Sequence, residues 1–193
     1  VFSGCTNLTN ITLPDSVNII EYGAFLGCEN LTEFIIPSNL RTINDSVFEG
    51  CGLTEITIPE GINYIGASAF LGCNNLSEIK IPEGVKRFYE CAFVGCSSLK
   101  EIYLPDSLEA IETSAFGSCS SLEELVIPAN VKEIGKDVFW GCTNLKKITI
   151  YAMETTFGEE ALNNSIATIY CYENSDAHKY ALENNIKFVL MEK

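Results

Sequence analysis

Several residues and patterns that mark common protein classes are scarce or missing in this chain. Its 193 residues include one histidine, His178, so no histidine pair is available for a metal, and no nucleophile is paired with this residue. Lysine and arginine total 12 against 26 aspartate and glutamate residues, for a formal charge of −14. This balance argues against nucleic acid and anionic membranes as partners. No apolar run approaches the ~20 residues of a membrane-spanning helix.

What the sequence does contain is a repeat. A phenylalanine recurs every 22 or 23 residues, in the pattern F-x-G-C-x-x-L-x-x-I-x-I-P-x-x-V-x-x-I; the positions are Phe2, Phe25, Phe48, Phe70, Phe93, Phe116 and Phe139. A period of this length predicts coils that stack so that equivalent residues form inward-facing columns. Because the chain starts inside a repeat, we expect it to be part of a longer protein.

Each repeat divides into three parts. The segment 76–81 ends in alternating isoleucines and predicts a short strand with Ile79 and Ile81 facing inward. A proline ends this strand in six repeats, and Val-x-x-Ile then predicts a shorter extended segment on the opposite wall. The third part is a turn, at whose start we expect helix N-caps at Gly23, Ser46, Ser68, Cys91, Ser114 and Asp137. A glycine before the cysteine closes this turn, and Gly117-Ser118 predicts a shift of one residue.

The pattern fades after Ile150, which suggests a repeat region over 1–150 and a degenerate last coil with a cap over 151–193, within one domain. Residues 166–171 again fit the strand pattern, and the residues between 151 and 165 look helix-leaning. We expect a helix over 176–185, in which His178 is solvated, and a last strand over 186–190. An atypical final unit with a polar outer face is what a solenoid needs at its end.

The repeats resemble the leucine-rich repeats of bacterial surface antigens of the BspA type. Residues 2–150 carry the resemblance, in repeats such as 96–105, and the segment 168–189 is similar to the family's C-terminal module. The resemblance implies a mostly β, α/β-type solenoid of stacked parallel strands with a small strand–helix–strand cap. It further implies an extracellular or cell-surface protein that adheres to host matrix or surface proteins, with no shared catalytic motif.

The nine cysteines suggest buried thiols more than disulfides or a metal site. Seven occupy one repeat column, where Cβ atoms run side by side at a spacing wider than a disulfide requires; they are Cys5, Cys28, Cys51, Cys73, Cys96, Cys119 and Cys142. There is no Cys-x-x-Cys pair of the kind that zinc sites use. Outside the column, Cys91 lies at a turn and is the better candidate for a reactive thiol.

An acidic column forms the sharpest surface pattern. We expect exposed, stacked carboxylates ~4.8 Å apart at Glu33, Glu55, Glu78, Glu101 and Glu124. Next to them runs a second exposed column that includes Ile35, Lys80, Tyr103 and Val126. Together these nine residues are our candidate binding face, because solenoids bind partners on the exposed sheet. Acidic residues around an exposed aromatic ring suit a basic or mixed-charge protein segment.

Other interpretations of the acidic column remain open. Neighbouring glutamates have the spacing of a retaining glycosidase pair, yet stacking imposes this spacing without any function. Calcium between them is another alternative, although a solvated acidic face is the simplest. We therefore predict no catalytic, metal or cofactor residues and a non-enzymatic adhesion or protein-binding module. The alternatives are a structural spacer that displays another domain and, more remotely, a glycan-acting enzyme.

Overall fold

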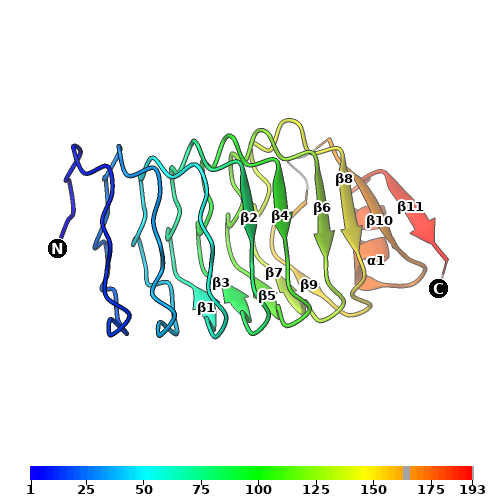
Figure 1. The fold of residues 1–193 in the computed structure, drawn as a ribbon. Coiled ribbons are helices and arrows are strands. Elements are labelled where there is room, and N and C mark those ends of the chain that lie inside the picture. Colours follow the sequence, from blue (N-terminus) through cyan, green and yellow to red (C-terminus); the bar gives the residue numbers. More distant parts are fainter. Residues whose placement is uncertain (163–165, 193) are drawn as a thin grey trace.

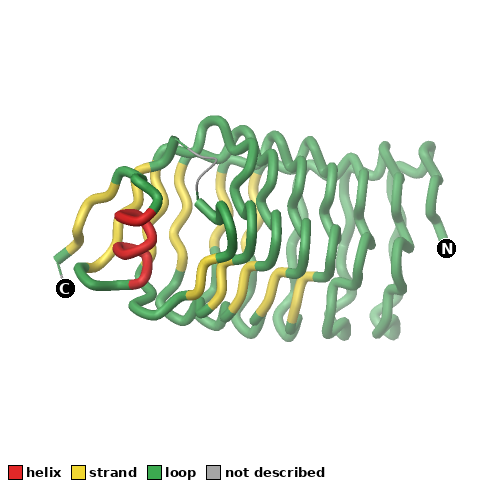
Figure 2. Tube along the Cα trace, turned by 180° about the vertical axis from the view of Figure 1, so that it is seen from behind, coloured by secondary structure: helices red, strands yellow, loops and turns green. Residues whose placement is uncertain are grey.

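The computed structural model describes residues 1–162 and 166–192, which form a mostly β solenoid with one short helix near the C-terminus (Figure 1). Successive coils stack along one axis, so that the two termini lie at opposite ends of the molecule (Figure 2). Among the described residues, no helix is long and apolar enough to cross a lipid bilayer.

One wall of the solenoid carries the strands that the alternating isoleucines predicted. They are β2 (Glu78–Lys80), β4 (Glu101–Tyr103), β6 (Glu124–Ile127), β8 (Lys147–Ile150) and β10 (Thr168–Tyr172), with β11 (Phe188–Met191) at the C-terminal end. All ladder pairs are parallel and join equivalent residues of adjacent coils, such as Ile79 with Ile102. The predicted stacking of like residues is therefore confirmed.

The opposite wall is the second extended segment that Val-x-x-Ile predicted. Its parallel sheet has the order β1 (Tyr64–Ile65), β3 (Arg87–Phe88), β5 (Ala110–Ile111), β7 (Glu133–Ile134) and β9 (Thr156–Phe157). These strands are two residues long because the chain turns immediately on either side. Sequence reasoning missed β9, since it expected helix-leaning residues between 151 and 165; residues 163–165 of that range lie outside the described residues.

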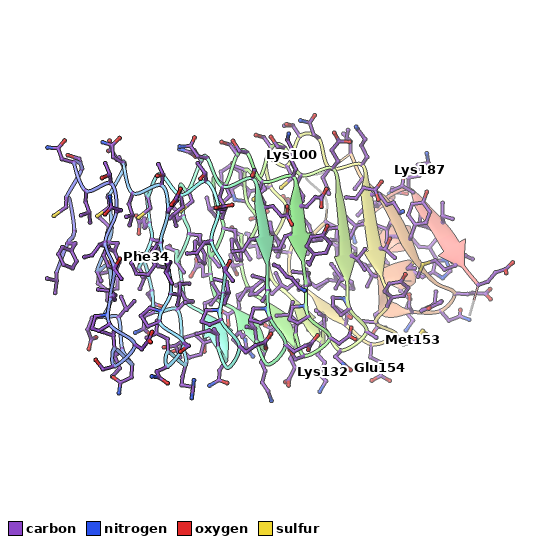
Figure 3. The ribbon with its side chains drawn as sticks, viewed as in Figure 1. Phe34, Lys100, Lys132, Met153, Glu154 and Lys187 are labelled. Atoms are coloured by element: carbon purple, nitrogen blue, oxygen red, sulfur yellow. The ribbon has the colours of Figure 1, made fainter. Side chains whose placement is uncertain are left out.

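Stacked phenylalanine rings fill the space between the two walls. The seven repeat phenylalanines form one column with ring centroids 5.4–5.9 Å apart and interplanar angles of 2–18°. Phe34, labelled in Figure 3, reaches in from its wall and contacts Phe25 and Phe48, with ring centroids 4.8 and 5.0 Å away. The core is thus continuous from coil to coil.

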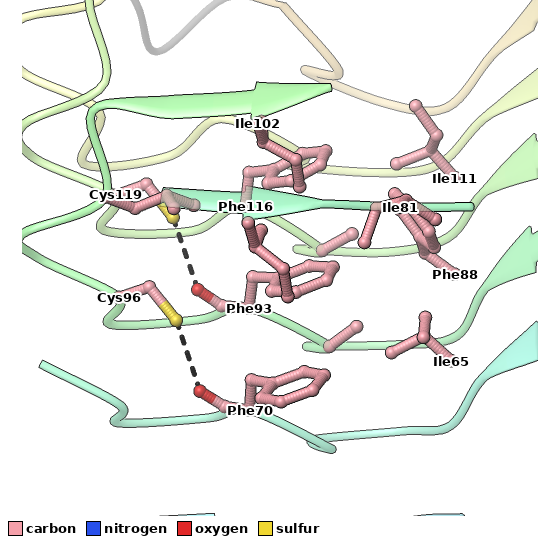
Figure 4. Close-up of a cluster of buried hydrophobic side chains, with 14 of the residues drawn as sticks. Ile65, Phe70, Ile81, Phe88, Phe93, Cys96, Ile102, Ile111, Phe116 and Cys119 are labelled. Carbon is pink, nitrogen blue, oxygen red and sulfur yellow. Dashed lines mark hydrogen bonds between the residues drawn. The ribbon is translucent and has the colours of Figure 1, made fainter. Parts of the chain in front are cut away.

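The thiol column is inward-facing and reduced, with a role beyond packing. In six coils the thiol donates a hydrogen bond to the carbonyl of the phenylalanine one coil earlier, as Cys96 does to Phe70 at 3.2 Å (Figure 4). All nine cysteines are free. Cys5 departs from the prediction because it is exposed.

The turn after the second wall differs from the prediction. The residues expected as N-caps all have φ between 53° and 59°, in the left-handed region, whereas an N-cap is extended; they are Gly23, Ser46, Ser68, Cys91, Ser114 and Asp137. No helix follows them in the described residues; the chain continues in hydrogen-bonded turns. The turn at Gly117-Ser118 is not shifted either, because Ser118 itself adopts φ 58° at the glycine position.

The C-terminal cap follows the predicted strand–helix–strand order. Helix α1 (Asp176–Glu183) begins at Ser175, whose hydroxyl accepts the backbone N–H of His178. Strand β11 then pairs in parallel with β10. His178 is half-buried rather than solvated, since its ring packs on Phe188 with centroids 4.8 Å apart and its Nδ1 accepts the N–H of Asn174.

Candidate functional site

All nine candidate residues lie on the outer face of the wall that carries β2, β4 and β6. Each of these strands alternates exposed and buried residues, so the residues between the core positions point outward. Three apolar side chains there are exposed: Ile35 at 78%, Tyr103 at 52% and Val126 at 51%. We call this surface, which also includes Glu33, Glu55, Glu78, Lys80, Glu101 and Glu124, the acidic face.

Strand register sets the neighbours on this face. Glu78 pairs with Glu101, and Lys80 with Tyr103, in the ladder between β2 and β4. Further toward the N-terminus an isolated bridge joins Ile35 to Thr57. Among the described residues, none of the carboxylates from Glu33 to Glu101 in this column forms an ion pair. Like charges therefore face one another across adjacent coils.

The acidic face is hollowed into two grooves. An N-terminal groove of about 950 Å³ is lined by Glu33, Ile35, Glu55, Glu78 and Lys80, among others. A C-terminal groove of about 1060 Å³ is lined by Glu101, Tyr103, Glu124, Val126, Tyr151 and Tyr172, among others. Every candidate residue thus lines one of the two grooves.

A break in the sheet underlies the C-terminal groove. Among the described residues, no backbone hydrogen bond joins β4 to β6, whereas β2–β4 and β6–β8 form regular ladders. Bonds at the turns still hold the two coils together, from Ser120 to the Ser97 carbonyl and from Asn130 to the Asp106 carbonyl. The wall opens between these two points, and Ile102 behind it is 8% exposed against 1% for Ile79.

Three tyrosines line the C-terminal groove, and the sequence predicted one of them. Tyr103 was predicted, but Tyr151 and Tyr172 were not; their ring centroids are 6.3 Å apart. The sequence held one signal, since Tyr151 stands where other repeats have the proline that ends the strand. Tyr172 lies at the end of β10, beyond the regular repeats, so only the fold brings it here.

Carboxylates surround the Tyr103 ring. The Tyr103 hydroxyl donates a hydrogen bond to Glu101, and this bond, together with repulsion from the Glu101 carboxylate, raises the pKa of Tyr103. The groove lining holds four acidic residues and one lysine, Lys100. Lys146 pairs with Glu123 at 2.8 Å and Lys147 with Glu124 at 3.4 Å, which leaves Glu101 and Asp106 without an ion pair among the described residues.

The opposite wall differs because several of its charged side chains form ion pairs with one another. Arg87 lies 2.7 Å from Glu112 and 3.6 Å from Glu133, and Lys86 lies 3.3 Å from Glu109. A surface whose charges already have partners attracts a charged ligand less strongly.

Catalysis and metal binding find little geometric support on the acidic face. Glu78 and Glu101 occupy equivalent positions of adjacent strands, whereas glycosidases separate their two carboxylates into an acid and a base by different surroundings. Among residues 1–162 and 166–192, no three histidine, cysteine, aspartate or glutamate side chains converge as metal ligands would.

Comparison with known proteins places this geometry among bacterial repeat proteins. Residues 1–120 and 72–188 match the model of the BspA type leucine rich repeat region, in six copies. No curated protein matches the chain.

Solved structures of similar fold come from several bacteria. A leucine-rich repeat protein from Bacteroides ovatus is 25% identical with a TM-score of 0.52, over 88% of this chain and 57% of that one. A leucine rich cell surface protein from Faecalibacterium prausnitzii is 28% identical with a TM-score of 0.57, over 68% of this chain and 36% of that one. The pneumococcal vaccine antigen PcpA, 22% identical with a TM-score of 0.55 over 82% of this chain and 44% of that one, shares the fold. The chain spans little more than half of the first of these proteins and less than half of the other two.

Proposed function

Because the chain belongs to the BspA-type leucine-rich repeat family, we propose that it is a non-enzymatic module that captures protein partners on its acidic face. The observation that carries the proposal is the position of the nine candidate residues, all of which line two grooves on one wall. A face with exposed apolar side chains among unpaired carboxylates offers both contact area and charge selectivity.

The proposed location is the cell surface or the extracellular space. One similar structure is described as a cell surface protein, and the family relation makes the same setting reasonable for this chain. Proteins of a host matrix or host surface are the partner class that we propose. The acidic face would attract a basic segment of such a partner over a distance of about 8 Å at physiological salt.

Charge reversal tests the proposal. Glu55, Glu78 and Glu101 are changed together to lysine, and capture of a panel of immobilised extracellular-matrix proteins is measured by surface plasmon resonance. We expect binding of the captured protein to fall at least about tenfold, since truncating or reversing a few central interface residues commonly removes most of the affinity.

A matched variant controls for the general loss of negative charge. Glu21, Glu29 and Glu90 are exposed glutamates that line neither groove, and their change to lysine alters the net charge equally. Equal losses in both triple variants would refute the acidic face as the binding site. Absence of any partner for the unaltered chain would favour the structural spacer, which predicts no capture by the solenoid itself.

A further inference from the structure

The chain already binds a lysine side chain on the acidic face, and this internal contact shows how a partner's lysine could be held. The Lys147 ammonium lies 3.4 Å from Glu124 and 5.1 Å from the centroid of the Tyr170 ring. A cation between a carboxylate and an aromatic face gains from both the charge and the ring quadrupole. Lys147 and Glu124 occupy the column of glutamates, while Tyr170 lies in the neighbouring column.

The same two columns recur at Tyr103 without a lysine in place. The ladders align Tyr170 with Thr149 and Thr149 with Val126, so Tyr103, one coil earlier, belongs to the same column as Tyr170. Its ring stands beside Glu101, and Glu78 is the ladder partner of Glu101. Here both neighbours in the charged column are carboxylates. Lys80 is the ladder partner of Tyr103, but no cation lies over the Tyr103 ring among the described residues.

The surroundings of Tyr103 also make room for an extended partner. Tyr103 lines the C-terminal groove beside the break between β4 and β6, where the wall is open and backbone groups of the two strands do not pair. Tyr151 and Tyr172 also line this groove. Among the described residues, by contrast, no tyrosine lines the N-terminal groove, whose lining includes Lys80.

We propose that the C-terminal groove holds the basic side chain of a lysine-bearing segment of a partner protein, with its ammonium group on the Tyr103 ring beside Glu101. This inference rests on the proposed function and names the chemistry that the same face recognises. The lysine stem would lie against Val126 and the groove tyrosines, as such side chains commonly bury their methylene groups while the charge stays near water.

A defined peptide tests the inference directly. The probe is a fluorescein-labelled peptide of alternating lysine and alanine, and its affinity for the intact chain is measured by fluorescence anisotropy at low salt. We expect saturable binding that weakens roughly fivefold in Tyr103→Leu, because a cation–π contact at a partly desolvated site contributes on this scale. Glu101→Gln should weaken binding by about the same factor, since it removes the adjacent charge.

Matched variants separate the groove from general attraction to an acidic protein. Tyr22→Leu changes a tyrosine that is 69% exposed and outside both grooves, and Glu29→Gln removes one exposed charge elsewhere. Both should keep the affinity within about twofold, as surface changes away from an interface do. The same peptide with acetylated lysines, which keep the stem and lose the charge, should bind far more weakly.

Several results would overturn the inference. These are equal losses in Tyr103→Leu and Tyr22→Leu, equal binding of the acetylated peptide, or no saturable binding of the lysine peptide. The two proposals fail separately. If capture of a matrix protein is lost in the triple charge reversal but unchanged in Tyr103→Leu, the acidic face remains the binding site and only the lysine site is refuted.

Discussion

Residues of one column share a structural role in this solenoid, and the cysteine column is the clearest example. The Phe70 carbonyl accepts two hydrogen bonds, from the Cys73 amide at 3.1 Å and from the Cys96 thiol at 3.2 Å. A thiol is small enough for the core and still donates to a buried carbonyl of the neighbouring coil. The column therefore links coils as well as filling space between them.

Burial of these thiols predicts a loss of stability at alkaline pH. Burial raises the pKa of the Cys51 thiol to about 12, against about 8.5 for an unfolded cysteine. Its contribution to stability is fully present below about pH 8.5 and is lost as pH rises toward 12, since only the unfolded chain then releases the proton. Each such thiol lowers the free energy of unfolding by up to ~1.4 kcal/mol per pH unit.

Denaturant titrations between pH 8.5 and 10.5 measure this slope. The slope in Cys51→Ala should be shallower than in the unaltered chain, because one buried thiol has been removed. Cys5→Ala serves as the control, because it removes an exposed side chain and leaves the buried thiols in place. Identical slopes in all three proteins would contradict the explanation.

Ser118 predicts a stabilising substitution. It stands at φ 58° in a column where six other coils have glycine, and a residue with a Cβ is strained in this region by about 1–2 kcal/mol. Ser118→Gly should therefore raise the free energy of unfolding by about 1 kcal/mol, after the entropy cost of glycine. Ser98→Gly, at a neighbouring serine without positive φ, should instead lower stability, and a decrease in both variants would refute the strain.

At the scale of the strands, most of the correct predictions came from the repeat pattern. One wall was predicted from the alternating isoleucines and the opposite wall from Val-x-x-Ile, because each coil must bury both sets of apolar residues. Strand β9 escaped prediction since Glu154 replaces the apolar residue found at Val131 one coil earlier. The sequence signal that remains for β9 is Phe157-Gly158, which parallels Ile134-Gly135 one coil earlier. Close packing of the coils requires this glycine, since a Cβ at Gly158 would come 2.6 Å from the backbone of Gly135.

The predicted N-caps failed for a related reason. Glycine, serine and aspartate are favoured at an N-cap, but glycine and aspartate also tolerate the left-handed region, so residue type alone left two conformations open. Hydrogen bonds between coils favour the left-handed conformation; for example, Ser68 donates its N–H to the Glu90 carbonyl one coil later. In the same way, the break between β4 and β6 depends on contacts between coils and has no signal within one repeat.

The phenylalanine column predicts a large cost when one ring is removed. Phe70 is fully buried between Phe48 and Phe93, with ring centroids 5.5 and 5.4 Å away. Phe70→Ala should lower the free energy of unfolding by about 3–5 kcal/mol, because the stacked neighbours cannot collapse into the gap. Phe2→Ala should cost less in the same denaturation assay, since Phe2 is partly exposed and, among the described residues, stacks only on Phe25. Equal costs would contradict the stacked core.

For the whole molecule, the distribution of charge matters more than its total of −14. On the opposite wall Arg87 pairs with Glu112, while the acidic face aligns Glu78 with Glu101. Like charges opposite one another in a sheet destabilise it. The proposed partner binding would account for a face that carries this repulsion.

This explanation predicts that stability and binding change in opposite directions. Glu78→Gln should raise the free energy of unfolding by about 0.2–1 kcal/mol at low salt, with the gain shrinking at high salt as the charges are screened. Capture of a partner by the same variant should weaken. A variant that loses stability, or gains both stability and affinity, would show that Glu78 does not serve the acidic face in this way.

The central claim is that partners bind the acidic face, and hydroxyl-radical footprinting of a captured complex tests it most directly. We predict that Tyr103 and Val126 lose reactivity when a partner is bound, while Tyr22 and Tyr89, which lie outside both grooves, keep theirs. Protection of Tyr22 and Tyr89 with no change at Tyr103 would contradict the account.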